Sequence, residues 1–162
     1  MISFTVLGQP QTAGSKRGFP FQKRDGKLGV HMVDDNPRSK DWKQQVAWAA
    51  REAHHGKLLE APLVVTMSFH RPRPKGHFRR DGSLSKAGLG STCPAVKPDL
   101  LKLARAAEDA CTGVIWRDDA QIVSEFLMKI WGEPARLEVR ISEVPDHGPL
   151  IFAVDLRSLL RG

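Results

Sequence analysis

Short apolar runs alternate with long polar segments along the chain, and the spacing within each run predicts its structure. Residues 2–7 and 62–70 are rich in β-branched and aromatic side chains, which indicates strands. Residues 135–143 alternate between apolar and polar side chains, as a strand with one buried face does. Residues 121–131 predict a fourth strand and residues 30–35 a short fifth one.

A first helix is indicated by Trp42 and Val46, which begin an apolar series at helical spacing that runs to about residue 55. We expect Asn36 to be its N-cap and Pro37 to occupy its first turn. Gly56 is expected to end it.

A second helix is expected over residues 99–112, where Leu103, Ala107 and Cys111 lie on one apolar stripe. Asp99 stands at its start, where an N-cap contributes about 1 kcal/mol. Capping is therefore the structural interpretation of this carboxylate, and a place in a functional site is the alternative.

Together these elements predict an α/β (α+β) domain with a small mixed sheet of four to five strands and two main helices. A chain of 162 residues suits one domain with a single core. We place that domain at residues 1–146, followed by a C-terminal extension of unknown role at 147–162. No apolar run reaches the roughly 18 residues that span a bilayer, and no secretory signal is visible, so we expect a cytoplasmic protein that does not enter membranes.

The chain is strongly basic, with a formal net charge of +7, which favours a polyanionic partner such as nucleic acid. The alternative is a basic enzyme that has no such partner. Cations gather in the first quarter of the chain and in the Pro- and Gly-rich segment 71–98, whereas the balance turns acidic after residue 105. This distribution indicates a DNA-binding surface beside a carboxylate-rich site.

The adjacent acids Asp118 and Asp119 have two interpretations, a solvated turn or part of a site. Neighbouring residues of a regular strand point to opposite faces, so both can serve one site only from a turn. A helix start and a strand start can bring Asp99 and Asp119 together. Paired carboxylates of this kind bind Mg²⁺, with Mn²⁺ as the alternative ion, and Mg²⁺ on a basic surface suits phosphodiester hydrolysis.

Residues 97–123, KPDLLKLARAAEDACTGVIWRDDAQIV, resemble the core motif of the RusA family of Holliday junction resolvases. The family pattern is Asp-x-Asp-Asn, then a basic residue, an Asp late in the helix, and Asp-Asp-x-Gln. The order of the other elements matches over about residues 3–143. The resemblance implies a RusA-like fold, a Mg²⁺-dependent endonuclease that cuts branched double-stranded DNA, a homodimer, and a bacterial host cell.

By position, the resemblance implies catalytic roles for three residues. Asp99 matches the first catalytic aspartate of the family, Asp119 the last, and Arg105 a functional lysine near the site. The metal ligands that it implies are Asp99 and Asp119, completed by Asp118 or Asp109. The residues that we expect to contact DNA are Lys16, Arg17, Arg79, Arg80, Lys97 and Lys102, although a solvated basic loop is a competing interpretation for the first two.

The chain departs from the family pattern at Leu101, where a second catalytic aspartate belongs, and at Lys102, where Asn belongs. A substitute carboxylate can complete the site, and Asp118 or Asp109 suits this better than Glu108, which lies roughly 10 Å along the helix from Leu101. The site can instead work with fewer protein ligands and more water. The third alternative is a catalytically inactive protein that only binds branched DNA.

Overall fold

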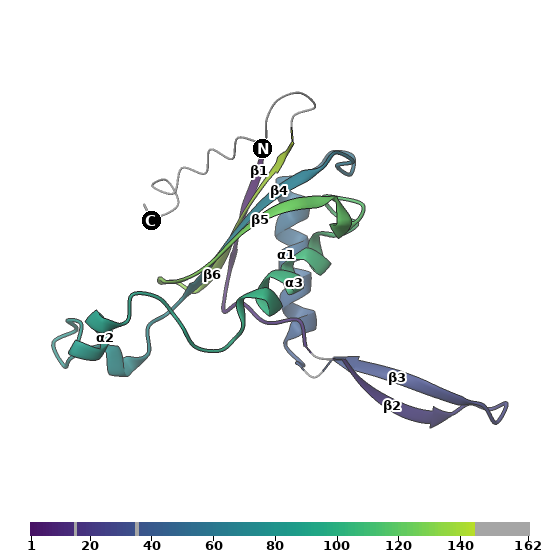
Figure 1. Ribbon diagram of the computed structural model, residues 1–162, viewed down its shortest axis with the longest axis horizontal. Helices are drawn as coiled ribbons and strands as arrows, with labels where there is room; N and C mark the ends of the chain where they lie inside the picture. The colour runs from purple at the N-terminus through teal and green to yellow at the C-terminus, as the bar shows by residue number, and fades with distance from the viewer. Residues whose placement is uncertain (15, 35, 145–162) are drawn as a thin grey trace.

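The computed structural model describes residues 1–14, 16–34 and 36–144, so the expected C-terminal extension lies outside the described residues. A four-stranded sheet forms the centre (Figure 1). Its strands are β1 (Ile2–Leu7), β4 (Leu63–Arg71), β5 (Ile122–Trp131) and β6 (Arg136–Glu143), in the order β1-β6-β4-β5. Only β4 and β5 run parallel to each other, whereas β6 is antiparallel to both of its neighbours. The expected mixed sheet is confirmed with four strands, whereas the strand expected at residues 30–35 falls in a separate two-stranded sheet.

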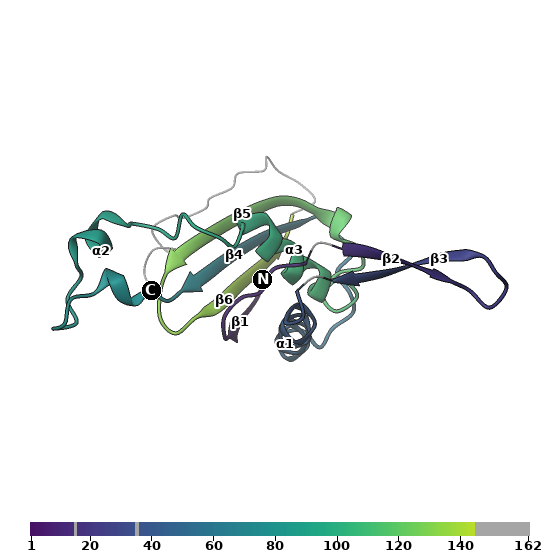
Figure 2. The same ribbon diagram turned by 90° about the horizontal axis from the view of Figure 1, so that it is seen from below.

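Two helices, α1 (Ser39–Ala53) and α3 (Leu100–Cys111), cover one face of this sheet (Figure 2). The buried core lies between them and the sheet, because alternate residues of β4 and β6 point toward the helices. It includes Trp42, Val46 and Ala50 from α1, Leu103, Ala107 and Cys111 from α3, and Val65, Met67 and Phe69 from β4. Within the described ranges, no helix has the length and apolar character needed to cross a bilayer.

The expected ends of α1 need correction. Its N-cap is Arg38, which makes no side-chain capping bond, and not Asn36. The Asn36 side chain instead accepts a hydrogen bond of 3.1 Å from the Arg38 N–H, in the turn that leads into the helix. The helix ends with His54 as its C-cap, two residues before Gly56. Asparagine is common both in turns and at helix N-caps, and the sequence alone did not distinguish these two positions for Asn36.

Strands β2 (Lys16–Gln22) and β3 (Leu28–Asp34) form a separate antiparallel hairpin. The Gly26 N–H donates to the Lys23 carbonyl at 2.9 Å, and Gly26 has a φ of +80°. Glycine suits this position because other residues are strained in the left-handed region. The basic segment between β1 and α1 therefore forms a hairpin, which extends away from the body in both views (Figures 1 and 2).

The segment between β4 and α3 is an ordered excursion that holds a short 3₁₀ turn (Lys75–His77) and the helix α2 (Lys86–Gly90). Arg73 organises it, donating from Nη1 to the carbonyls of Gly88 and Ser91 at 2.9 and 3.0 Å. Its guanidinium also lies 5.4 Å from the centre of the Trp131 ring. Hydrogen bonds from Arg73 to partly buried carbonyls thus order a segment whose composition alone predicts a loop.

Candidate active site

The segment before α3 is fixed by two cations from the sheet. Lys129 donates from Nζ to the carbonyls of Val96 and Pro98, at 2.7 and 2.9 Å. Arg71 donates from Nη1 to the Lys97 carbonyl at 2.7 Å. Three consecutive carbonyls are therefore held against the ends of β4 and β5. These bonds set the position at which α3, and with it Asp99, begins.

Asp99 is the N-cap residue of α3 but makes no side-chain capping hydrogen bond. The sequence predicted that Asp99 stands at the start of this helix. Its carboxylate does not perform the capping function that was the structural interpretation of this residue. The side chain is exposed. Its carboxylate therefore lies free of capping bonds at the N-terminal end of α3.

Leu101, Arg105 and Glu108 follow on one side of α3, because their spacing of four and three residues returns to the same face. Leu101 is 73% exposed although it is apolar. It therefore contributes little to the core, and nothing in its packing explains why leucine stands there. Arg105 is exposed on the same side.

Asp118 and Asp119 lie in a turn, as one shared site requires. A short 3₁₀ helix spans Asp119–Gln121, and Asp118 is its N-cap, accepting from the Ala120 N–H at 2.9 Å. The Gln121 side chain completes a capping box by accepting from the Asp118 N–H at 3.0 Å. The Ala120 bond, and then a hydrogen bond with the Asp119 side chain, lower the pKa of Asp118. Asp118 is therefore engaged in shaping the turn that presents Asp119.

Gln121 also joins this turn to the rest of the fold. Its Nε2 donates to the carbonyls of Leu59 and Ala61 at 2.9 and 3.2 Å, while its Oε1 accepts from the Arg117 N–H at 2.9 Å. The Gln121 amide thus connects the backbone of this turn to the backbone at residues 59 and 61. This explains physically why an Asp-Asp-x-Gln sequence forms a defined turn.

We expect Gln121→Ala to lower the free energy of unfolding by about 2 kcal/mol, because it removes the donor to the partly buried carbonyls of Leu59 and Ala61. Cleavage activity should fall by about tenfold or more, since the turn that carries Asp119 loses its support. Urea unfolding and cleavage rates measure the two effects. The exposed Gln44→Ala on α1 is the matched control and should change neither.

Glu108 belongs to an acidic group that the sequence interpretation missed. Burial is the largest cause that raises the pKa of Glu108 to about 7. The charge and hydrogen bond of Glu125 and then the charges of Asp119 and Asp109 supply the rest of that rise. Glu108 had been set aside because it lies far from Leu101 along the helix, but Asp119 approaches from another element. Glu125 alternates with Leu127 and Lys129 on the helix-facing side of β5, a signal that period-two spacing could have given.

The pKa of Glu108 predicts a dependence of stability on pH in metal-free buffer. Because folding raises this pKa, the folded state favours protonated Glu108. The contribution of protonated Glu108 to the free energy of unfolding is lost as pH rises through about 7. Wild-type protein should therefore lose unfolding free energy between about pH 5 and pH 8 relative to Glu108→Gln, whose amide does not ionise. Urea unfolding in EDTA measures this difference. Parallel pH profiles for the two proteins would rule out a raised pKa of Glu108 in the folded state.

Asp109 is held elsewhere, because its Oδ2 accepts from Lys43 Nζ at 2.6 Å and so ties α3 to α1. In the part of the chain that the structure describes, no three His, Cys, Asp or Glu side chains are arranged to hold a metal ion. Mg²⁺ requires only one or two carboxylates when it keeps several waters. Asp99 and Asp119, which are exposed and make no side-chain capping bond, suit that kind of site in their donor chemistry.

The expected DNA-contacting residues lie in three segments of the fold. Lys97 and Lys102 are exposed next to Asp99 and Leu101. Arg79 and Arg80 are exposed in the excursion between β4 and α3. Lys16 and Arg17 begin β2, at the base of the hairpin.

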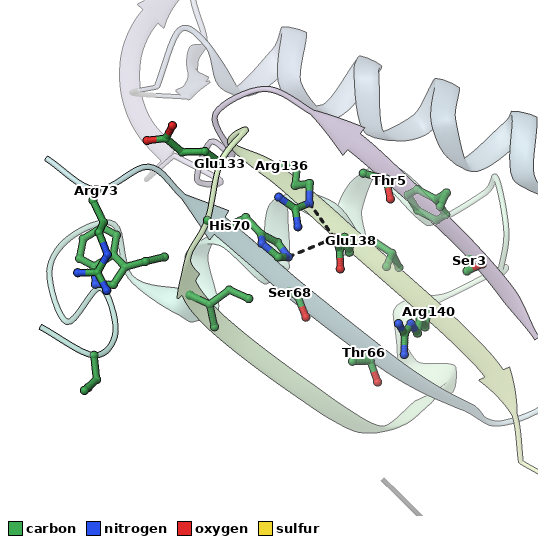
Figure 3. A pocket seen from close by; sticks show the side chains of 16 residues that line it. Ser3, Thr5, Thr66, Ser68, His70, Arg73, Glu133, Arg136, Glu138 and Arg140 are labelled. Carbon is green, nitrogen blue, oxygen red and sulfur yellow. Dashed lines mark hydrogen bonds and ion pairs between the residues drawn. The ribbon is translucent and has the colours of Figure 1, made fainter. Parts of the chain in front are cut away.

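The opposite face of the sheet carries a hollow of about 780 Å³ (Figure 3). At its centre Glu138 Oε1 lies 2.7 Å from Arg136 Nε and 3.3 Å from Nε2 of the buried His70. Burial is the main cause that lowers the pKa of His70. The other polar side chains that line the hollow are Ser3, Thr5, Thr66, Ser68, Arg73, Thr92, Glu133 and Arg140. This hollow is separated by the sheet from Asp99 and α3.

Comparison with known proteins gives two matches. The family model described as Endodeoxyribonuclease RusA matches residues 12–142, which include the hairpin, both main helices and the Asp118–Gln121 turn. A relative in Bacillus subtilis (strain 168), named Uncharacterized protein YqaN, is 35% identical over 143 residues. That match covers 88% of this chain and 96% of the relative. The name of the relative assigns no activity.

Proposed function

The chain belongs to the RusA family of endodeoxyribonucleases, and from this premise we propose that it is a Mg²⁺-dependent endonuclease that cuts branched DNA such as Holliday junctions. Recombination, repair or phage DNA processing in the bacterial cytoplasm is the setting that we propose. The observation that carries the proposal is the turn at Asp118–Gln121. Asp118 and Gln121 shape the turn through backbone hydrogen bonds, and Asp119 is presented at the surface beside α3.

Asp99 and Asp119 are the residues that we propose to hold the metal, with Asp118 orienting the site through the turn that presents Asp119. Mg²⁺, when bound, lowers the pKa of a coordinated water and offsets charge on the scissile phosphate. Mn²⁺ can serve the same purpose. Arg105 stands on the same side of α3 and would donate to the scissile phosphate as its negative charge develops. The carbonyl contacts of Lys129 and Arg71 would preserve the position of Asp99 during catalysis.

The basic residues around the site would position the DNA backbone. Lys97 and Lys102 lie beside Asp99, and Arg79 and Arg80 extend the basic surface. Contacts of this kind fix the register of DNA but do not read its sequence. With Lys16 and Arg17 at the base of the hairpin, they would account for binding that weakens as salt rises.

A homodimer is also part of the proposal, because two sites are needed to cut two opposed strands of one junction. Its support is the family resemblance. Sedimentation should give twice the chain mass of 18.0 kDa. If sedimentation shows a monomer at the concentrations at which junctions are cut, the homodimer is contradicted and the proposed cleavage activity is not.

A non-catalytic junction-binding protein is the second candidate, and one observation favours it. Leu101 stands exposed where the family has an aspartate, so a ligand is missing from the matched position. Binding to branched DNA by the basic surface does not need that carboxylate. Cleavage therefore separates the two candidates, whereas affinity does not.

The test is cleavage of a synthetic four-way junction compared with a linear duplex that contains the same arm sequences. The proposal predicts nicks near the branch of the junction and an intact duplex. Equal cutting of both substrates would indicate a nuclease without branch selectivity. Stable binding to the junction without nicks would support the second candidate.

A further inference from the structure

The β2–β3 hairpin leaves apolar side chains exposed on both of its faces. Phe19 and Phe21, two residues apart on one face, are 55% and 47% exposed. On the other face Leu28 and Val30 are 81% and 63% exposed. A two-stranded hairpin is marginally stable alone in water, and grouped exposed apolar side chains indicate a binding surface. This hairpin therefore needs a partner to cover it.

The charge of the hairpin indicates a polyanion as that partner. Its sequence from residue 16 to residue 34 holds five Lys and Arg residues against two acids. The exposed tip of the hairpin holds Lys23, Arg24 and Lys27. Lys27 Nζ lies 4.0 Å from Asp25 Oδ2 there. A second copy of this chain, with its net charge of +7, is a poorer electrostatic match.

The edge of β2 also opposes the addition of another strand. The Lys23 N–H donates to the Lys27 carbonyl at 2.8 Å, and hydrogen-bonded and non-bonded pairs alternate from there along the ladder. Pro20, paired with Val30, therefore falls at a non-bonded position whose N–H would point outward. Proline removes that outward donor without weakening the hairpin. Pairing with a strand of a second copy is disfavoured at this point.

The base of the hairpin is attached beside the candidate active site. The Ala13 N–H donates to the Lys102 carbonyl in the first turn of α3 at 2.9 Å. On the other side of the base, Asn36 donates from Nδ2 to the Thr12 carbonyl at 3.1 Å. A ligand that lies along the hairpin is thus led toward Asp99 and Leu101.

We propose that the β2–β3 hairpin is a DNA-binding arm that enters the major groove of a duplex arm of the branched substrate. The proposal rests on the proposed function. The major groove accommodates a two-stranded ribbon, with apolar side chains against base edges and thymine methyl groups. Phe21 is pre-oriented for such contact, because its ring crosses Gly29 so closely that a Cβ there would lie 2.7 Å from Phe21 Cζ. Lys23, Arg24 and Lys27 contact the flanking phosphates.

Binding of the full chain to a labelled four-way junction in EDTA, followed by fluorescence anisotropy over a range of salt, tests the arm. The double variant F19S/F21S should bind about tenfold or more weakly, because apolar contacts are lost, while the salt dependence stays unchanged. The triple variant K23Q/R24Q/K27Q should reduce the slope of log K against log salt by up to about 2.7, or about 0.9 per phosphate contact. Trp48→Ser, an exposed aromatic change on α1, should match wild type.

The outcomes separate the arm from the enzyme. If wild type cuts junctions but both hairpin variants bind as Trp48→Ser does, the arm is excluded and the proposed function stands. If F19S/F21S instead converts a dimer to a monomer in sedimentation, the hairpin contacts a second copy and the DNA proposal is overturned. If wild type neither binds nor cuts junctions, the proposed function itself fails. Because the triple variant changes only side chains at the tip, it tests the arm even if F19S/F21S folds poorly.

Discussion

Asp119→Asn is expected to lower Mg²⁺-dependent cleavage of a four-way junction by about 100-fold or more, since even outer-shell partners of a metal contribute 10- to 100-fold. The amide keeps the size of the side chain and removes its charge. The turn should survive, because the bonds that hold its backbone are accepted by the side chains of Asp118 and Gln121. Cleavage rates over a Mg²⁺ titration measure the effect.

Two controls accompany this variant. Asp41→Asn removes an exposed carboxylate from the first turn of α1 and should leave cleavage unchanged. Junction affinity of Asp119→Asn in EDTA should equal or exceed that of wild type, because a negative charge near the DNA is lost. Cleavage by Asp119→Asn at the wild-type rate would remove Asp119 from the site.

Leu101→Asp is expected to increase cleavage at low Mg²⁺, with the concentration of Mg²⁺ needed for half-maximal rate lowered by about tenfold. The new carboxylate would stand at the position where the family has its second catalytic aspartate. The fold should accept it, because Leu101 is 73% exposed in the first turn of α3. An acid there interacts favourably with the helix dipole by about 0.3–1 kcal/mol.

Leu101→Asn is the matched control, because it is polar and similar in size but supplies no negative charge. If Asp and Asn at position 101 give the same Mg²⁺ requirement, the position does not contribute to metal binding in this chain. If wild type is inactive and Leu101→Asp cuts, the natural chain is the non-catalytic binder, and the remaining residues of the site are intact.

The main strands and helices could be predicted because their burial follows directly from spacing. Alternation in β6 and the stripe Leu103, Ala107 and Cys111 in α3 each have one geometric solution. The start of α1 was placed wrongly because Asn36 forms the turn before the helix, and local chemistry is similar in the two positions. The ordered conformation of residues 71–98 depends on hydrogen bonds from Arg73 to carbonyls distant in sequence. No local sequence pattern predicts these bonds.

Some features of the candidate site could likewise be predicted from the sequence, and others could not. Sequence predicted the positions of Asp99 and of the Asp118–Asp119 turn, because each stands at the end of a recognisable element. It did not predict that Glu108 meets Glu125 and Asp119, since that contact depends on how α3 lies against β5. Nor could it predict that Lys129 and Arg71 fix the carbonyls before Asp99. Long-range contacts of this kind depend on tertiary packing.

The most direct test is the reaction of wild-type protein with a four-way junction in Mg²⁺ and in EDTA, at a protein concentration that binds all of the DNA. Our account predicts paired nicks placed symmetrically across the branch in Mg²⁺, and an intact, fully bound junction in EDTA. A junction that remains bound and intact under both conditions would contradict the proposed endonuclease.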